Sequence, residues 1–195
     1  MNKDENSDKK MKMMKKYNLS SEFYDQRYEN IQRQKYEIIL TRKYIQGGYY
    51  LDIGCGTGLF FDMLRNFLGK RVYYFIGMDI SIKMLQKFDE KLNNLNKKKR
   101  RRLSLLVADL EHLPFREKSF STFFSFTTFQ NTESFPKAFK EVKRVAQKNS
   151  TMISSILKKS KSKEIFLDQI NKNLKESELI VENLTEDILV RGFIK

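Results

Sequence analysis

Short apolar runs alternate with amphipathic segments along most of the chain. Apolar positions recur at helical spacing from about Ser20 to Tyr44, and Gly47 and Gly48 end this first segment. The apolar runs predict strands over residues 49–53, 72–78, 103–108, 120–127 and 151–157, and a terminal hairpin over 179–184 and 188–194. Helical patterns lie between them over residues 59–68, 81–92, 135–147 and 163–176. This alternation predicts an α/β fold with right-handed crossovers, in which a seven-stranded, mostly parallel sheet has an antiparallel last strand.

The first twenty residues differ from the rest of the chain. Residues 1–20 are polar and rich in lysine, so we expect a flexible or loosely helical basic tail, followed by a single domain over residues 21–195. Hydrophobic residues make up 40% of the sequence, which is enough for a core, and two prolines and one cysteine exclude collagen-like and disulfide-stapled classes. No uncharged apolar run approaches the roughly 18–20 residues of a membrane span, and residues 1–16 do not resemble a secretory signal. We therefore expect a cytoplasmic protein that has no membrane contact.

Charge is distributed unevenly. The chain carries 38 Lys and Arg against 24 Asp and Glu, a formal net charge of +14. The excess lies in residues 1–16, in Lys97–Arg102 and in residues 137–163. Such patches favour contact with RNA or an acidic partner, although a solvated, solubilising surface explains them equally well. Lys158–Lys163 follows the fifth predicted strand and is therefore expected on the ligand-binding side of the sheet, whereas Lys97–Arg102 precedes the third strand and is expected at the opposite end.

A glycine cluster follows the first predicted strand. Gly54-Cys55-Gly56-Thr57-Gly58 has glycines at alternate positions, which permit positive φ and let a ligand lie against the backbone. A dinucleotide fingerprint would need a glycine three residues after Gly56, where this chain has Leu59. Asp52 precedes the cluster by two residues, and Asp79 and Asp109 end the second and third strands. Any one of these aspartates alone would be interpreted as a loop cap, but their occurrence at consecutive strand ends indicates one ligand site.

The glycine loop and its aspartates resemble the motifs of class I S-adenosylmethionine-dependent methyltransferases of the type 11-like group, over nearly the whole chain from about Tyr24. The resemblance implies a Rossmann-like fold with helices on both faces of the sheet, S-adenosylmethionine as cofactor and no metal. It implies that Asp79 binds both ribose hydroxyls, that Asp109 accepts from the adenine amine and that Asp52 orders the methionyl end. The cofactor-binding residues expected on this basis are Tyr24, Asp52, Gly54, Cys55, Gly56, Gly58, Asp79, Ile80, Asp109, Leu110 and Ser125.

The methyl acceptor is less well defined. Residues 125–131, at the end of the fourth strand, lack the Asn/Asp-Pro-Pro-Tyr signature of amino-nitrogen methyltransferases and the cysteine of pyrimidine carbon methylation. Asn131 and Tyr28 are weak candidates for catalytic contacts, and His112 is interpreted as part of a packing loop rather than as a base. We expect the substrate to be RNA, contacted through Lys158–Lys163, or a translation-related protein. A small-molecule or lipid methyltransferase and a non-catalytic cofactor-binding module remain as alternatives.

The third strand is expected at the edge of the sheet in this family. Arg102–Val107 is long and apolar for an exposed edge, and such edges tend to acquire a partner strand. The pattern resembles that of small methyltransferases that are activated by a zinc-ribbon subunit docked on this edge. We therefore expect a zinc-ribbon partner at Arg102–Val107.

Overall fold

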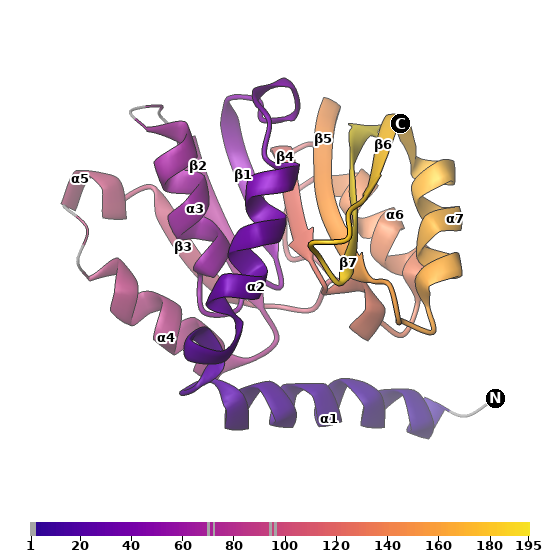
Figure 1. Ribbon diagram of the computed structural model, residues 1–195, viewed down its shortest axis with the longest axis horizontal. Coiled ribbons are helices and arrows are strands. Elements are labelled where there is room, and N and C mark those ends of the chain that lie inside the picture. The colour runs from indigo at the N-terminus through magenta and orange to yellow at the C-terminus, as the bar shows by residue number, and fades with distance from the viewer. Residues whose placement is uncertain (1–2, 70, 72, 94, 96) are drawn as a thin grey trace.

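A seven-stranded sheet forms the centre of the protein. The computed structural model describes residues 3–69, 71, 73–93, 95 and 97–195, with side chains from residue 10 onward. The strands are β1 (Gly48–Ile53), β2 (Tyr73–Asp79), β3 (Leu103–Val107), β4 (Phe120–Phe126), β5 (Ala146–Leu157), β6 (Leu174–Val181) and β7 (Asp187–Ile194). Their order in the sheet is β3-β2-β1-β4-β5-β7-β6 (Figure 1). β1 to β5 pair in parallel and β7 is antiparallel to both of its neighbours, which confirms the predicted Rossmann-like methyltransferase fold.

Helices cover both faces of this sheet (Figure 1). One face carries α2 (Tyr24–Ile39), α3 (Leu59–Leu68) and α4 (Ile82–Leu92), and the other carries α6 (Phe135–Val145) and α7 (Lys163–Asn173). The short α5 (Lys97–Arg100) precedes β3, and single 3-10 turns, η1 (Arg42–Tyr44) and η2 (Phe129–Asn131), precede β1 and follow β4. The N-terminal α1 (Lys3–Ser20) runs past the end of the sheet where β1 and β2 finish (Figure 1). Among the described residues, no helix is both long enough and apolar enough to cross a membrane.

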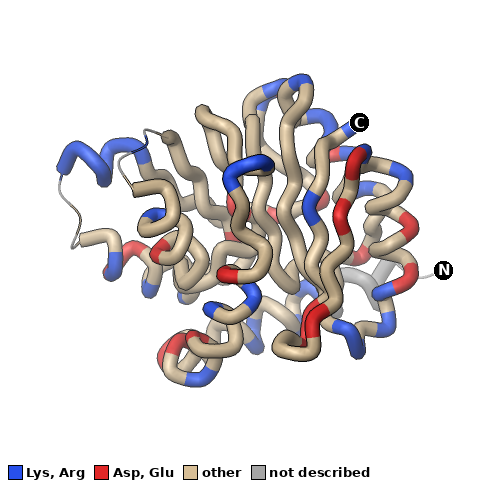
Figure 2. Tube along the Cα trace, turned by 45° about the horizontal axis from the view of Figure 1, so that its top comes forward, with Lys and Arg blue, Asp and Glu red and all other residues tan. Residues whose placement is uncertain are grey.

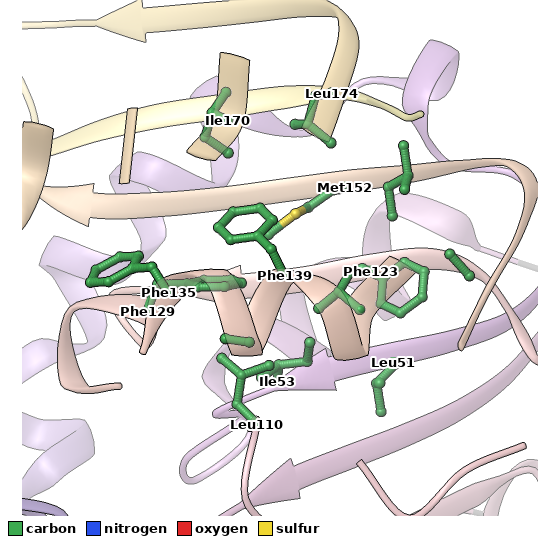
Figure 3. Close-up of a cluster of buried hydrophobic side chains, with 14 of the residues drawn as sticks. Leu51, Ile53, Leu110, Phe123, Phe129, Phe135, Phe139, Met152, Ile170 and Leu174 are labelled. Atoms are coloured by element: carbon green, nitrogen blue, oxygen red, sulfur yellow. The ribbon is translucent and has the colours of Figure 1, made fainter. Parts of the chain in front are cut away.

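The core lies in two layers because strand side chains alternate between the faces. Leu51 and Ile53 of β1 belong to the layer under α6 and α7, whereas Tyr50 belongs to the layer under α2 and α3. Figure 3 shows the first layer, in which Phe129, Phe135 and Phe139 pack beside strand residues. Every residue of β4 is buried, as expected for a central parallel strand covered on both faces.

Serine caps place two of the helices that follow strands. The side-chain oxygen of Ser81 accepts from the backbone N–H of Met84 at the start of α4. Ser134 caps α6 in the same way through the N–H of Lys137, and Pro136 lies in the first turn of that helix. The chain therefore enters α4 directly after the end of β2, which fixes the backbone beside Asp79.

The N-terminal part of the chain differs from its prediction. Residues 3–20, for which we expected a flexible or loosely helical tail, are helical and form α1, and residues 1 and 2 lie outside the described part. The predicted helix over residues 20–44 is divided, because Leu40 adopts an extended conformation after α2 and η1 follows as a separate turn. Val72, the predicted start of the second strand, also lies outside the described residues.

The C-terminal part of the chain also departs from the predicted boundaries. The last helix ends at Asn173 rather than at residue 176, because Leu174 is buried and pairs with Ile194 in the sheet. β6 is accordingly longer than the predicted strand over residues 179–184. Tertiary pairing thus overrides the local helical pattern at this point.

Two ion pairs tie other elements to β7. Lys35 of α2 donates to Asp187 over 2.6 Å, and both side chains are buried. Burial lowers the pKa of Lys35, against the attraction of Asp187. Near the other end of β7, Glu178 of β6 accepts from the Tyr44 hydroxyl and the Arg191 guanidinium, and these bonds lower the pKa of Glu178 to about 2.

Candidate active site

A cavity of about 110 Å³ lies where β1, β2 and β4 end. Its walls come from the β1–α3 loop, the end of β2, the segment after β3, the end of β4 and the two N-terminal helices. A smaller cavity of about 30 Å³ adjoins it and shares Tyr24, Gly54, Gly56, Phe126 and Thr127 as wall residues. The carboxyl ends of the strands therefore form the site, as is usual in open parallel sheets.

The glycine loop needs its glycines for two different reasons. Gly54 has φ 74°, its N–H donates to Met78 O over 2.7 Å, and a Cβ at this position would collide with the Thr128 side chain. Gly56 has φ 54°, but a Cβ there would meet no atom within 4 Å. Because Gly56 lines both cavities, this open space is where a ligand can approach the backbone.

Asp52 contributes a buried carboxylate to the smaller cavity. Its side chain is 1% exposed, and its Oδ2 atom has no hydrogen-bond partner within the described part of the chain. Burial and the nearby Asp79 raise the pKa of Asp52 well above its usual value. An unpartnered buried carboxylate oxygen of this kind is suited to a cationic or hydrogen-bond-donating ligand group.

Asp79 is held rigidly at the end of β2. Its Oδ1 accepts from the N–H of Ser81 over 2.8 Å, and its Oδ2 accepts from the N–H of Gly56 over 3.0 Å. Burial nevertheless raises the pKa of Asp79, against these backbone hydrogen bonds. Each carboxylate oxygen has a further lone pair, so Asp79 can also accept from a ligand in the cavity that it lines.

Asp109 is paired with a lysine from α1. Its Oδ2 accepts from Lys10 Nζ over 2.7 Å, and its Oδ1 accepts from the N–H of Glu111 over 2.9 Å. Burial raises the pKa of Asp109, but Lys10 and the backbone hydrogen bond outweigh it, so the pKa lies below its usual value. The Lys10 ammonium also lies 3.3 Å from Glu111 and 3.8 Å from Glu133, which anchors α1 over this side of the cavity.

Two tyrosines from the N-terminal helices line the larger cavity. Tyr24 of α2 lines both cavities and packs edge-on against Tyr17 of α1, with ring centroids 6.4 Å apart. Burial raises the pKa of both hydroxyls, so both are neutral at neutral pH. Asn131 lines the larger cavity, where its amide nitrogen lies 3.4 Å from the Tyr17 hydroxyl and from Thr127 O.

The structure brings most of the sequence-predicted site residues together. The predicted residues that line one or both cavities are Tyr24, Asp52, Gly54, Cys55, Gly56, Asp79, Ile80, Asp109, Leu110 and Asn131. Cys55 is buried, and burial raises the pKa of its thiol well above the usual value, so its thiolate form is disfavoured.

Three of the predicted site residues do not line either cavity. Gly58 packs against Phe88, where a Cβ would collide with the ring. Ser125 lies within β4, one residue before the cavity wall begins at Phe126, and its buried Oγ finds no partner among the described residues. Tyr28 packs on Tyr24, with ring centroids 4.8 Å apart.

Sequence reasoning missed the contribution of α1. Lys10, Met13 and Tyr17 line the cavity, and their spacing of three and four residues places them on one face of a helix. That spacing was the available signal, but Lys10 is itself polar and the apolar residues Met11, Met14 and Leu19 lie at other positions of the segment, so no single apolar face is evident from the sequence. Thr127 was also missed as a wall residue, and its φ of 57° is uncommon for a β-branched residue.

Hydrogen bonds from β5 and α2 hold Thr127. Its N–H donates to Ser155 Oγ over 3.2 Å, and that hydroxyl donates to Asp187 over 2.8 Å. The Lys35 ammonium donates to Thr127 Oγ1 over 3.3 Å. The buried Lys35–Asp187 pair therefore supports the strained residue at which the cavity wall turns.

Most of the Lys158–Lys163 patch is engaged within the protein. Lys158 donates to the carbonyl oxygens of Glu182 and Thr185 over 2.7 and 2.6 Å. Lys159 lies 3.3 Å from Glu186, and Lys163 lies 3.3 Å from Glu164. These contacts leave less of the patch for RNA than its sequence implied.

The hydrogen-bond acceptors of the site and its open glycine backbone fit a nucleoside that carries an amino-acid group. The unpartnered Asp52 Oδ2 can accept from an ammonium, Asp79 can accept from two hydroxyls, and the open face of Gly56 admits a ligand to the backbone. Within the described chain, no group of three or more His, Cys, Asp and Glu side chains could hold a metal ion.

Comparisons with known proteins agree with this geometry. Residues 51–154, more than half of the chain, match the family model described as "Methyltransferase domain". An uncharacterized protein of Methanocaldococcus jannaschii is 32% identical over 152 residues, which cover 75% of this chain and 52% of that protein. A malonyl-[acyl-carrier protein] O-methyltransferase of Hamiltonella defensa is 31% identical over 62% of this chain and 42% of its own length. The chain thus spans about half the length of these curated relatives.

Solved structures show the same fold at low sequence identity. A Methanococcus maripaludis protein described as an S-adenosyl-L-methionine-dependent methyltransferase has a TM-score of 0.72 at 15% identity, over 92% of each chain. A Haloferax volcanii protein described as a methyltransferase, solved in complex with the Trm112 methyltransferase activator, has a TM-score of 0.66 at 14% identity, over 91% of this chain and 97% of that one. The family match covers more than half of the chain and the sheet topology agrees with it, so this chain belongs to the methyltransferase domain family.

Proposed function

We propose that the protein transfers the methyl group of S-adenosylmethionine to RNA or to a translation-related protein. The observation that carries this proposal is the net charge of +14, which favours a polyanionic or acidic partner over an apolar small molecule. The positive charge raises the affinity for the substrate and the rate at which the substrate associates, whereas the cavity walls determine which acceptor atom is methylated.

The cofactor is proposed to lie along the three aspartates. Asp52 orders the methionyl end, Asp79 accepts from both ribose hydroxyls and Asp109 accepts from the adenine amine. The positions of Asp52 beside the smaller cavity and of the other two in the larger cavity support this order. For Asp109 to accept from adenine, it must share or release the Lys10 ammonium that it now binds.

The acceptor is proposed to be an atom with a free lone pair at neutral pH. The ionisable side chains among the described residues lining the larger cavity are Lys10, Tyr17, Tyr24, Asp79 and Asp109. The tyrosine hydroxyls are neutral, Lys10 is cationic, and we assign both aspartates to the cofactor. None of these side chains is therefore available as a general base for the methyl acceptor. S-adenosylmethionine supplies a methyl group on a sulfonium, for which alignment with a lone pair gives most of the acceleration. A ring nitrogen of a base, an unprotonated amine or a carboxylate meets this requirement.

A carboxylate on a small molecule is the second candidate acceptor. Its support is the name of the relatives that act on malonyl-[acyl-carrier protein] as O-methyltransferases, at 28–31% identity. A carboxylate needs no base, so the same cavity chemistry would serve. A non-catalytic cofactor-binding module is the third possibility, which would bind the cofactor without turnover.

The discriminating experiment is methyl transfer into fractionated cell extract. Purified protein and S-adenosylmethionine with a labelled methyl group are incubated with extract, and label is counted separately in RNA, protein, lipid and small molecules. We expect label in RNA or protein, and its absence with Asp79→Ala. Label only in lipid or small molecules would refute the proposed substrate class, and cofactor binding without label in any fraction would indicate a binding module.

We further propose that a zinc-ribbon subunit docks on the edge of β3. A groove lined by β3 and α4 follows this edge, with Val107 47% and Ile82 50% exposed. Phe75 N–H bonds to Arg102 O, and Ala108 N–H bonds to Asp79 O. Because alternate residues of a parallel strand face opposite neighbours, Leu105 then directs its N–H away from β2. The proposal is supported by the similar fold of the Haloferax volcanii protein, which was solved in complex with the Trm112 methyltransferase activator.

Proline substitutions at neighbouring positions test the docking edge. Leu105→Pro should abolish partner binding and leave the pairing of β2 with β3 intact, because the lost N–H points outward. Leu106→Pro is the contrasting variant, which removes a bond to β2 and should lower the melting temperature of the protein itself. If the co-expressed partner still copurifies with a folded Leu105→Pro protein, the docking proposal is wrong.

A further inference from the structure

A second cavity lies at the opposite end of the sheet from the active site. Its volume is about 290 Å³, close to the lower end of the size range of small-ligand pockets. Ten described residues line it, and they include five cationic side chains and no Asp or Glu. The five cations of this amino-end cavity are Arg65, Arg71, Lys98, Lys99 and Arg102. Figure 2 shows α5, which supplies Lys98 and Lys99, as a basic segment that projects from one end of the molecule.

The floor of the amino-end cavity is aromatic and apolar. Phe61 and Tyr73 line it together with Leu95 and Leu103. Tyr73 already stacks on Tyr50, with ring centroids 5.2 Å apart and planes inclined by 14°. A planar group that enters the cavity would therefore lie beside an existing ring stack.

One polar atom at the amino-end cavity lacks a partner. Arg65 Nε is buried and donates to no acceptor within the described residues, and the Arg65 guanidinium reaches Asp62 only over 3.5 Å. A buried N–H donor without an acceptor is unfavourable, and a phosphate oxygen would satisfy it. Five cations, an aromatic floor and an unpartnered guanidinium N–H together match a phosphorylated ligand that has a planar base.

We infer that the amino-end cavity and α5 form an RNA-binding surface that is separate from the methyl-transfer site. An acidic protein would use the cations but not the ring stack, whereas single-stranded RNA uses both, through its phosphates and its unstacked bases. The choice of RNA rests on the proposed function, while the cavity and its charges do not depend on it.

The distance between the two sites defines what this surface does. Tyr73 lines the amino-end cavity and Asp79 lines the active-site cavity, and they are six residues apart on β2. At about 3.3 Å per residue, the two sites are about 20 Å apart. The surface therefore anchors a strand long enough to pass around the molecule, and it does not hold the base that is methylated.

The test measures binding of fluorescein-labelled single-stranded RNA by anisotropy at several salt concentrations. The variant Lys98→Gln/Lys99→Gln/Arg102→Gln removes three cations of the surface. The matched control Lys140→Gln/Lys143→Gln/Lys148→Gln removes three exposed cations from α6 and β5. At about 0.7 per neutralised phosphate, the first variant should reduce the slope of log K against log salt by about 2, and the control should not. Equal effects of the two variants would overturn the inference.

A second comparison separates RNA from other polyanions. Tyr73→Leu, checked by thermal melting, should weaken RNA binding about fivefold or more through lost stacking and leave binding of polyglutamate unchanged. If polyglutamate binds as tightly as RNA and responds to the same variants, the surface recognises only charge and the inference is wrong.

Methylation of RNA is measured independently. RNA that binds through this surface without becoming methylated refutes RNA as the acceptor but not the surface, whereas methylated RNA whose binding ignores both variants refutes the surface alone.

Discussion

Replacing Lys35 by methionine should destabilise the protein by about 3–5 kcal/mol, the usual range for removing one partner of a buried ion pair. Lys35 and Asp187 are 3% and 4% exposed and 2.6 Å apart. Without the ammonium, Asp187 stays buried with the Ser155 hydroxyl as its other side-chain donor. For a chain of this length, each kcal/mol corresponds to roughly 2–4 °C, so the melting temperature should fall by about 6–20 °C.

An exposed ion pair provides the matched control. Lys172 lies 2.6 Å from Asp168 on α7, the same separation as in the buried pair, but the two side chains are 64% and 50% exposed. Lys172→Met should change the free energy of unfolding by no more than about 0.5 kcal/mol. Urea unfolding of both variants, followed by circular dichroism, gives the two free energies. The reasoning fails if Lys35→Met is within about 1 kcal/mol of the wild type, or if the two variants are equally destabilised.

The same substitution should affect turnover more than cofactor binding. Lys35 donates to the Thr127 hydroxyl, and Asp187 reaches the Thr127 N–H through Ser155. Loss of this support lets the strained Thr127 relax at the cavity wall, while the hydrogen bond between Gly56 N–H and Asp79 is kept. Assayed below its melting temperature, Lys35→Met should therefore bind S-adenosylmethionine nearly normally and transfer methyl groups more slowly.

Two further predictions concern the glycine loop and acid stability. Gly54→Ala should destabilise the protein more than Gly56→Ala in urea unfolding, because both positions have positive φ but only the first adds a collision, with Thr128; Gly56→Ala should instead weaken cofactor binding in calorimetry. Glu178, whose pKa is about 2, stabilises the fold above its ordinary pKa of 4.5 and loses that contribution as pH falls toward 2, so the stability difference between wild type and Glu178→Gln should shrink across that interval. The glycine prediction is contradicted if Gly56→Ala lowers the free energy of unfolding more than Gly54→Ala does. The prediction for Glu178 is contradicted if the difference in free energy of unfolding between wild type and Glu178→Gln does not change with pH.

Local pattern was sufficient to predict most of the sheet and the gathering of Asp79 and Asp109 at one edge of it. The apolar runs identified the strands because central parallel strands are buried on both faces, as all seven residues of β4 are. The aspartates were predicted together because parallel strands end at one edge of a sheet, and Asp79 and Asp109 do line one cavity.

The features that sequence reasoning missed depend on contacts between distant segments. Lys10 meets Asp109, 99 residues away, so nothing near Lys10 in the sequence indicates that α1 covers the cavity. Leu174 continues a helical pattern but pairs with Ile194, and sheet pairing determines its conformation. Thr127 adopts positive φ because hydrogen bonds from α2 and β5 hold it there.

Titration calorimetry with S-adenosylmethionine tests the central claim most directly. The wild-type protein should bind it, Asp79→Ala should bind it much more weakly because the carboxylate at the end of β2 is lost, and Asp168→Ala, which removes an exposed carboxylate on α7, should bind it like the wild type. Equal binding by all three proteins would show that the cavity beside Asp79 is not the cofactor site. Binding of NAD by the wild type, with no heat from S-adenosylmethionine or its demethylated product, would contradict the assignment as a methyltransferase.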